Sequence, residues 1–168
     1  HITKDELNDM RFSYPLQQVG VEDKALVKAY SDDFFAEIVY KKKTMPHAVE
    51  ALEYLSSKYN LYILSNGFRE LQEQKMRSAG VDKYFKKVVL SEDIGVHKPF
   101  PEIFYFAMSA TQSELHTSLM IGDNWENDIA GAKDAGLGQV FYNVKKTTKF
   151  SFQPTGIIED WNEIGKIL

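Results

Sequence analysis

The chain has 168 residues, and its 43% hydrophobic and 26% charged residues fit about one globular domain and exclude disorder. The net charge of −4 disfavours partners such as nucleic acid or an anionic membrane, and the absence of cysteine excludes disulfides, thiolate metal sites and a cysteine nucleophile. No apolar run approaches a membrane span and no signal peptide is visible, so we expect a cytoplasmic protein.

Residues 1–43 predict two helices and no strand. Thr3 and Glu6 fit a capping box at the start of the first helix, and Pro15 predicts a kink or an end of that helix. A second helix over residues 22–39 is predicted by an apolar stripe at i, i+4 spacing: Leu26, Tyr30, Phe34 and Ile38. Two such helices form half of a helical bundle.

From Thr44 onward, short apolar runs alternate with helical patterns. Apolar runs without two-residue alternation are typical of strands buried on both faces, and their alternation with helices favours parallel βαβ units. The expected strands cover residues 61–64, 88–90, 119–121, 139–142 and 156–158. We therefore predict an α/β fold with a doubly wound parallel sheet.

Polar residues follow three of these strands, at the edge where open parallel sheets bind ligands. They are Ser65, Asn66, Gly67, Lys98, Asp123 and Asp128. A strand that turns into a helix presents unpaired N–H groups to an anion, a lysine neutralises a phosphoryl group, and carboxylates suit Mg²⁺. The sequence therefore predicts a phosphate site beside a cation site.

Each of these residues also has an ordinary structural explanation. Ser-Asn-Gly is common in turns, and a lone lysine such as Lys98 is commonly solvated. Asp123 also suits a helix cap, and Asp128 suits the first turn of a helix, where the dipole favours an acid. Gly122 is expected to let the chain turn tightly before Asp123.

In order and spacing, the polar residues resemble the motifs of the haloacid dehalogenase-like (HAD) hydrolases. Leu61 to Asn66 resembles motif II, Lys98-Pro99 resembles motif III, and Gly122 to Asp128 resembles the phosphatase form of motif IV. The resemblance implies a Rossmann-like parallel sheet, a helical cap and Mg²⁺-dependent phosphoryl transfer. It also implies that residues 1–43 are the second half of the cap and that residues 44–168 are the core without its first strand.

The resemblance implies a role for each residue. Lys98 and a Mg²⁺ ion held partly by Asp123 would stabilise charge on the transferring group, Ser65 and the amides beyond it would hold the phosphoryl oxygens, and Asp128 would order the metal site or Lys98. The implied catalytic residues are Lys98, Ser65 and Asp128, the substrate-binding residues are Ser65, Asn66, Gly67 and Lys98, and the metal ligands are Asp123 and Asp128.

Two longer stretches narrow the resemblance. Residues 65–72, with the sequence SNGFRELQ, and residues 91–99, with the sequence SEDIGVHKP, are similar to the noncanonical pyrimidine 5′-nucleotidases. This branch implies a small phosphorylated substrate, specifically a nucleoside monophosphate.

One departure from the family pattern is serious. HAD enzymes carry motif I, Asp-x-Asp, at the end of their first strand, and its first Asp is the nucleophile that forms an aspartyl-phosphate. No such strand is predicted before residue 44, and Asp32-Asp33 lies in a helical pattern. Two hypotheses follow: a phosphomonoesterase completed by a missing N-terminal fragment or a second chain, or a truncated, inactive binding or interaction protein.

Overall fold

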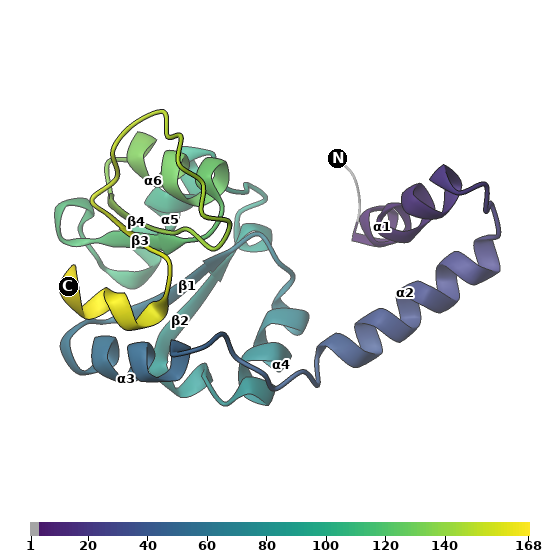
Figure 1. Cartoon of the computed structure of the whole chain (residues 1–168), viewed down its shortest axis with the longest axis horizontal. Coiled ribbons are helices and arrows are strands. Elements are labelled where there is room, and N and C mark those ends of the chain that lie inside the picture. The colour runs from purple at the N-terminus through teal and green to yellow at the C-terminus, as the bar shows by residue number, and fades with distance from the viewer. Residues whose placement is uncertain (1–3) are drawn as a thin grey trace. The chain divides into compact units, whose positions relative to one another are not determined.

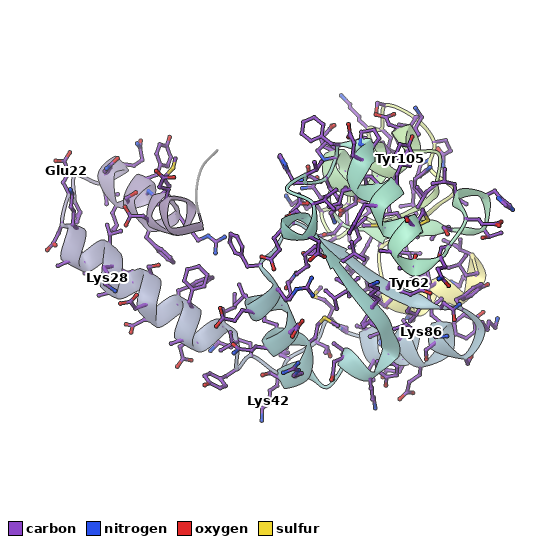
Figure 2. All side chains as sticks on the ribbon, turned by 180° about the vertical axis from the view of Figure 1, so that it is seen from behind. Glu22, Lys28, Lys42, Tyr62, Lys86 and Tyr105 are labelled. Atoms are coloured by element: carbon purple, nitrogen blue, oxygen red, sulfur yellow. The ribbon has the colours of Figure 1, made fainter. Side chains whose placement is uncertain are left out.

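The computed structural model describes residues 4–168, so the predicted capping residue Thr3 lies outside the described residues. The chain divides into two compact units, His1–Lys42 and Lys43–Leu168, and Lys42 at this division is labelled in Figure 2. Among the described residues, no helix is long and apolar enough to cross a membrane.

The first unit is a pair of helices. Helix α1 (Lys4–Gln18) contains Pro15 and continues past it, so the kink or end expected at that residue does not stop the helix before Gln18. Helix α2 (Lys24–Ile38) begins after Asp23, whose carboxylate accepts hydrogen bonds from the N–H groups of Ala25 and Leu26 at 2.8 and 3.1 Å. This cap satisfies two N–H groups that a helix start leaves without partners.

The apolar stripe predicted on α2 is only partly covered. Phe34 packs edge-on against Phe12 of α1, with ring centroids 5.4 Å apart. Leu26 and Tyr30 are 38% and 52% exposed, whereas their neighbour Val27 is 5% exposed. The contact surface between two helices is narrow. Apolar residues spaced four apart therefore predict the helix, but they do not determine which of those residues is buried.

The second unit alternates helices and strands as predicted (Figure 1). Its elements are α3 (Ala48–Lys58), β1 (Leu61–Ser65), α4 (Arg69–Ala79), β2 (Phe85–Leu90), α5 (Pro101–Thr111), β3 (Leu119–Gly122), α6 (Gly131–Asp134), β4 (Gly138–Tyr142) and β5 (Gly156–Ile158). Strands β1 and β2 pair in parallel, and β3, β4 and β5 form a second parallel ladder. The predicted α/β class with parallel strands is confirmed.

Apolar clusters cover both faces of the strands. One cluster unites α3 with β4 and β5 through residues such as Leu55 and Val140, and the other unites α5 with α6 through Phe104 and Ala132. Strand β3 serves both: Leu119 and Ile121 pack against the first cluster and Met120 against the second. Successive strand residues point to opposite faces, so this division is that of a doubly wound sheet.

Two strand edges in the middle of the unit have no partner. Within residues 4–168, β1 pairs only with β2, and β3 pairs only with β4. Every residue of β1 and β3 is half-buried, whereas four of the five residues of β4 are buried. The apolar runs of β1 and β3 are thus less buried than we expected for strands inside a parallel sheet.

Candidate functional site

Lys98 is the centre of the candidate site. Lys98 is 8% exposed, and its ammonium group donates hydrogen bonds to the Leu64 carbonyl at 2.8 Å and to Asp128 Oδ1 at 2.6 Å. Leu64 lies at the carboxyl end of β1, and Asp128 lies in the segment that follows β3. A buried ammonium must be paired to offset its lost hydration, so Lys98 is held firmly at this sheet edge.

The Asn66 side chain fixes the backbone of Lys98. Asn66 Oδ1 accepts from the Lys98 N–H at 2.8 Å, and Asn66 Nδ2 donates to the Lys98 carbonyl at 3.0 Å. The peptide bond between Lys98 and Pro99 is cis. Both polar ends of the Asn66 amide are therefore engaged in the protein, and this side chain positions the backbone of Lys98.

Asp128 is held on both of its carboxylate oxygens. Oδ1 accepts from Lys98, and Oδ2 accepts from the N–H of Asn124 at 3.0 Å. The residue is 5% exposed and belongs to a π-helical segment, Trp125–Ala130, where we expected an ordinary α-helix. Such segments are frequent at functional sites. This geometry fits the role of ordering Lys98, which was one of the two roles implied for Asp128.

Two glycines allow the close fit around Lys98 and Asp128. A Cβ atom at Gly122 would lie 2.4 Å from the Asp128 side chain, and one at Gly131 would lie 2.9 Å from the backbone of Pro99. Neither glycine has a positive φ angle. Gly122 is therefore required for the approach of a side chain, not for the tight turn that we expected.

Asp123 stands apart from this network. It is exposed at the end of β3, and among residues 4–168 its carboxylate makes no hydrogen bond or ion pair. The described residues also contain no group of three or more His, Cys, Asp or Glu side chains placed to hold a metal. Mg²⁺ often takes only one or two protein carboxylates and keeps several waters, so a single exposed carboxylate such as that of Asp123 is chemically able to supply one ligand.

Ser65 and Gly67 interact with each other at the end of β1. The Gly67 N–H donates to Ser65 Oγ at 3.0 Å, and Gln72 Nε2 donates to the same oxygen at 2.6 Å. The Gly67 N–H, which we had assigned to the substrate, is thus used to orient Ser65. Gln72 lies in the stretch 65–72 that is similar to the nucleotidases, but the sequence alone predicts no role for it.

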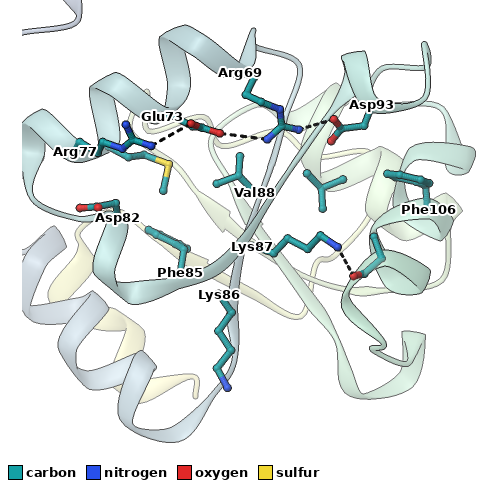
Figure 3. Close-up of a pocket in the computed structure, with 13 residues that line it drawn as sticks. Arg69, Glu73, Arg77, Asp82, Phe85, Lys86, Lys87, Val88, Asp93 and Phe106 are labelled. Carbon is teal, nitrogen blue, oxygen red and sulfur yellow. Dashed lines mark hydrogen bonds and ion pairs between the residues drawn. The ribbon is translucent and has the colours of Figure 1, made fainter.

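An arginine joins the segments that follow β1 and β2. The Arg69 N–H donates to Glu92 at 3.1 Å, and its guanidinium pairs with Asp93 (Figure 3). Burial opposes ionisation of Asp93, but the Leu90 N–H and the Arg69 guanidinium outweigh it and hold the pKa of Asp93 below its ordinary value. Because Lys98 follows Asp93 by five residues, this pair restrains the loop that carries Lys98.

A separate pocket of about 570 Å³ lies beside β2 (Figure 3). Its lining includes Arg69, Arg77, Lys87 and Phe106. Ser65, Lys98 and Asp123, which the sequence predicts at one edge of the sheet, do not line this pocket. The predicted residues that the structure joins directly form two groups, Asn66 with Lys98 and Asp128, and Ser65 with Gly67.

Comparisons with known proteins agree with the motif order. A family model described as haloacid dehalogenase-like hydrolase matches residues 9–136. The chain is 33% identical to the pyrimidine 5′-nucleotidase YjjG of Escherichia coli over 161 residues, covering 95% of this chain and 68% of that protein. It is 30% identical to the pyrimidine 5′-nucleotidase PynA of Streptococcus pneumoniae over 145 residues, covering 84% of this chain and 60% of the relative.

The fold has a close counterpart among solved structures. The crystal structure of YfnB from Bacillus subtilis, bound to magnesium, superposes with a TM-score of 0.87 and 29% identity over 98% of this chain and 72% of that one. The chain thus spans about three fifths to two thirds of the length of the two nucleotidases it matches.

Proposed function

Because the chain belongs to the haloacid dehalogenase-like hydrolase family, we propose that it forms most of the active site of a phosphomonoester hydrolase. The observation that carries the proposal is the buried Lys98–Asp128 pair at the ends of β1 and β3. An ammonium fixed at this edge is preorganised to neutralise charge that develops on a transferring phosphoryl group.

The proposed substrate is a nucleoside 5′-monophosphate. Two curated relatives that cover most of this chain are pyrimidine 5′-nucleotidases, which favours a pyrimidine base. The motif stretches 65–72 and 91–99 meet in the structure through Arg69, Glu92 and Asp93, and the same two stretches supply Asn66 and Lys98 to the candidate site.

In this proposal each described residue has one task. Lys98 binds the phosphoryl group, Ser65 donates a hydrogen bond to one of its oxygens, and Asp128 and Asn66 hold Lys98 in place. Asp123 supplies one oxygen ligand to Mg²⁺. When bound, the ion supplies further positive charge at the phosphoryl group.

The nucleophile would come from outside the given sequence. We assign it to an Asp-x-Asp at the end of a strand that pairs between β1 and β3. The unpaired, apolar and half-buried edges of these two strands support this assignment, because buried N–H and C=O groups without partners are costly. Residues 1–42 would form part of a helical cap.

Phosphatase assays on the protein supplied with an Asp-x-Asp segment, as one longer chain or as a second chain, test the proposal. We expect turnover of p-nitrophenyl phosphate and of uridine and thymidine 5′-monophosphates, with slower turnover of adenosine 5′-monophosphate, and none from the 168-residue chain by itself. Lys98→Ala and Asp123→Ala should each reduce the rate on the order of 10²–10³-fold. Lys87→Ala, on the exposed edge of β2, is the matched control and should leave the rate unchanged.

Two outcomes would decide against the proposal. Near-normal rates for Lys98→Ala and Asp123→Ala would contradict the assigned roles. Phosphate binding without turnover, in the presence of the Asp-x-Asp segment, would instead favour a catalytically inactive HAD-like binding protein.

A further inference from the structure

The hydrogen bonds around Ser65 restrict what its hydroxyl can do. A serine hydroxyl has one proton to donate and two lone pairs that accept. Ser65 Oγ accepts from the Gly67 N–H at 3.0 Å and from Gln72 Nε2 at 2.6 Å, so both lone pairs are used. Within residues 4–168 its proton has no acceptor. The hydroxyl is thus left as a donor toward a group that binds at the end of β1.

Gln72 reaches Ser65 because of two features of the local backbone. Helix α4 begins directly after Phe68, and the Gln72 N–H closes its first turn on the Phe68 carbonyl at 2.9 Å. Gly67 leaves the space that the amide occupies, since a Cβ atom at this position would lie 3.0 Å from Gln72 Cγ and from Nε2. The absence of a side chain at Gly67 therefore matters for the contact between Gln72 and Ser65.

We propose that Gln72 is a positioning residue that fixes the direction of the Ser65 hydrogen bond, so that the hydroxyl donates to an anionic oxygen of the substrate. This inference rests on the phosphoryl site proposed above. An amide nitrogen can only donate to Ser65, whereas a carboxylate at the same place would accept the serine proton and remove it from the ligand. The side chain at position 72 therefore determines whether the Ser65 hydroxyl can donate its hydrogen bond to an anion.

Sulfate binding to the full chain tests this inference, because the charge of sulfate stays constant between pH 4 and 8. Titration calorimetry at pH 7 should give affinities for Ser65→Ala and Gln72→Met on the order of tenfold weaker than for the unsubstituted chain. The two losses should not add: Gln72→Met should have no further effect in the Ser65→Ala background. Gln74→Met, at an exposed position of α4, makes the same chemical change without altering the charge and should leave the sulfate affinity unchanged.

A pH series separates this role from a merely structural one. Gln72→Glu keeps the shape of the side chain but reverses the hydrogen bond at neutral pH. Its sulfate affinity, relative to the unsubstituted chain, should be lowest near pH 7 and should recover as pH falls through about 4.3, where the new carboxyl is protonated and can donate. A structural role would give no such recovery.

The outcomes distinguish the inference from the function on which it rests. Sulfate binding that Lys98→Ala weakens, but that Gln72→Met and Gln72→Glu leave unchanged, would overturn the role of Gln72 alone. Additive losses for Ser65→Ala and Gln72→Met would do the same. No sulfate binding by the unsubstituted chain, at concentrations up to tens of millimolar, would overturn the phosphoryl site and this inference together.

Discussion

The outer edge of β2 and the inner edges of β1 and β3 differ in composition, although all three are unpaired within the described residues. The β2 strand carries Lys86 and Lys87, both exposed, and Lys87 also donates to the Ala110 carbonyl at 2.8 Å (Figure 3). The apolar runs Leu61–Leu64 and Leu119–Ile121 of the inner strands contain no charged residue.

This difference indicates how each edge meets its surroundings. Lysines on an edge strand discourage pairing with another chain, so β2 is suited to end a sheet in water. Apolar, half-buried edges such as those of β1 and β3 are suited to a neighbouring strand. At their carboxyl ends these two strands are joined by Lys98, whose ammonium contacts Leu64 and Asp128.

The largest expected effect is therefore on Lys98. Lys98→Met would leave the Asp128 carboxylate buried without its cation, and we expect a loss of about 3–5 kcal/mol in the free energy of unfolding. Urea unfolding followed by circular dichroism measures this loss. Adding Asp128→Asn should restore most of the stability, because the unpaired charge is removed.

The matching substitution on the outer edge is Lys87→Met. Its side chain is exposed, so the change in unfolding free energy should stay within about 0.5 kcal/mol. Equal losses for Lys98→Met and Lys87→Met would remove the distinction between the inner and outer edges.

A second prediction concerns the glycine in the inner strand β3. Gly122→Ala would place a Cβ atom 2.4 Å from Asp128, and we expect a loss of about 1–3 kcal/mol in unfolding free energy. Gly138→Ala in β4 is the control, since the nearest atom there would be 3.5 Å away. Thermal unfolding of both variants compares them, and a Gly122→Ala protein as stable as Gly138→Ala would contradict the tight fit.

A smaller, pH-dependent effect is expected where the segments after β1 and β2 meet. The pKa of Asp93 is lowered in the folded protein, so its ionised form stabilises the fold above the ordinary pKa of about 3.9 and loses this effect as pH falls through the lower folded value. Asp93→Asn should therefore cost about 1 kcal/mol at pH 7, and this cost should shrink as pH falls below about 3.9. A stability difference that does not change with pH would exclude the ionised Asp93–Arg69 pair as its cause.

The smallest effect on stability is expected from changing the lysines of the β2 edge to threonine. The double substitution Lys86→Thr and Lys87→Thr should alter unfolding free energy by less than about 0.5 kcal/mol but should increase self-association. Analytical ultracentrifugation over a range of concentrations measures this. An unchanged sedimentation profile would show that the two lysines do not protect the edge.

The strands and the site edge could be predicted from the sequence because both depend on local patterns. Apolar runs located all five strands to within a few residues, and the polar residues after them fell at the expected edge. The helices of the first unit were also found, but not that Val27, rather than Leu26, would be buried. Which of the two residues is buried depends on how α1 packs against α2, and the spacing of apolar residues along α2 alone contains no information about that packing.

The contacts inside the site could not be predicted in the same way. Asn66 and Lys98 are 32 residues apart, and Lys98 and Asp128 are 30 apart, so their pairing depends on how separate βα units pack. The hydrogen bonds between Asn66 and the Lys98 backbone, and the space that Gly122 leaves for Asp128, likewise arise only when these segments pack together in the folded protein. Gln72 could have been noticed, because it lies in the same motif as Ser65 and one turn into the following helix.

The links made by Asn66, Lys98, Asp128 and Arg69 have a consequence for hydrogen exchange. They connect the loops after β1, β2 and β3, so no one of these loops can open without breaking bonds to another. Backbone amides in the three loops should then exchange with solvent in one concerted opening, with similar opening free energies, although each loop is exposed in places. A ligand that contacts only one loop would slow exchange in all three.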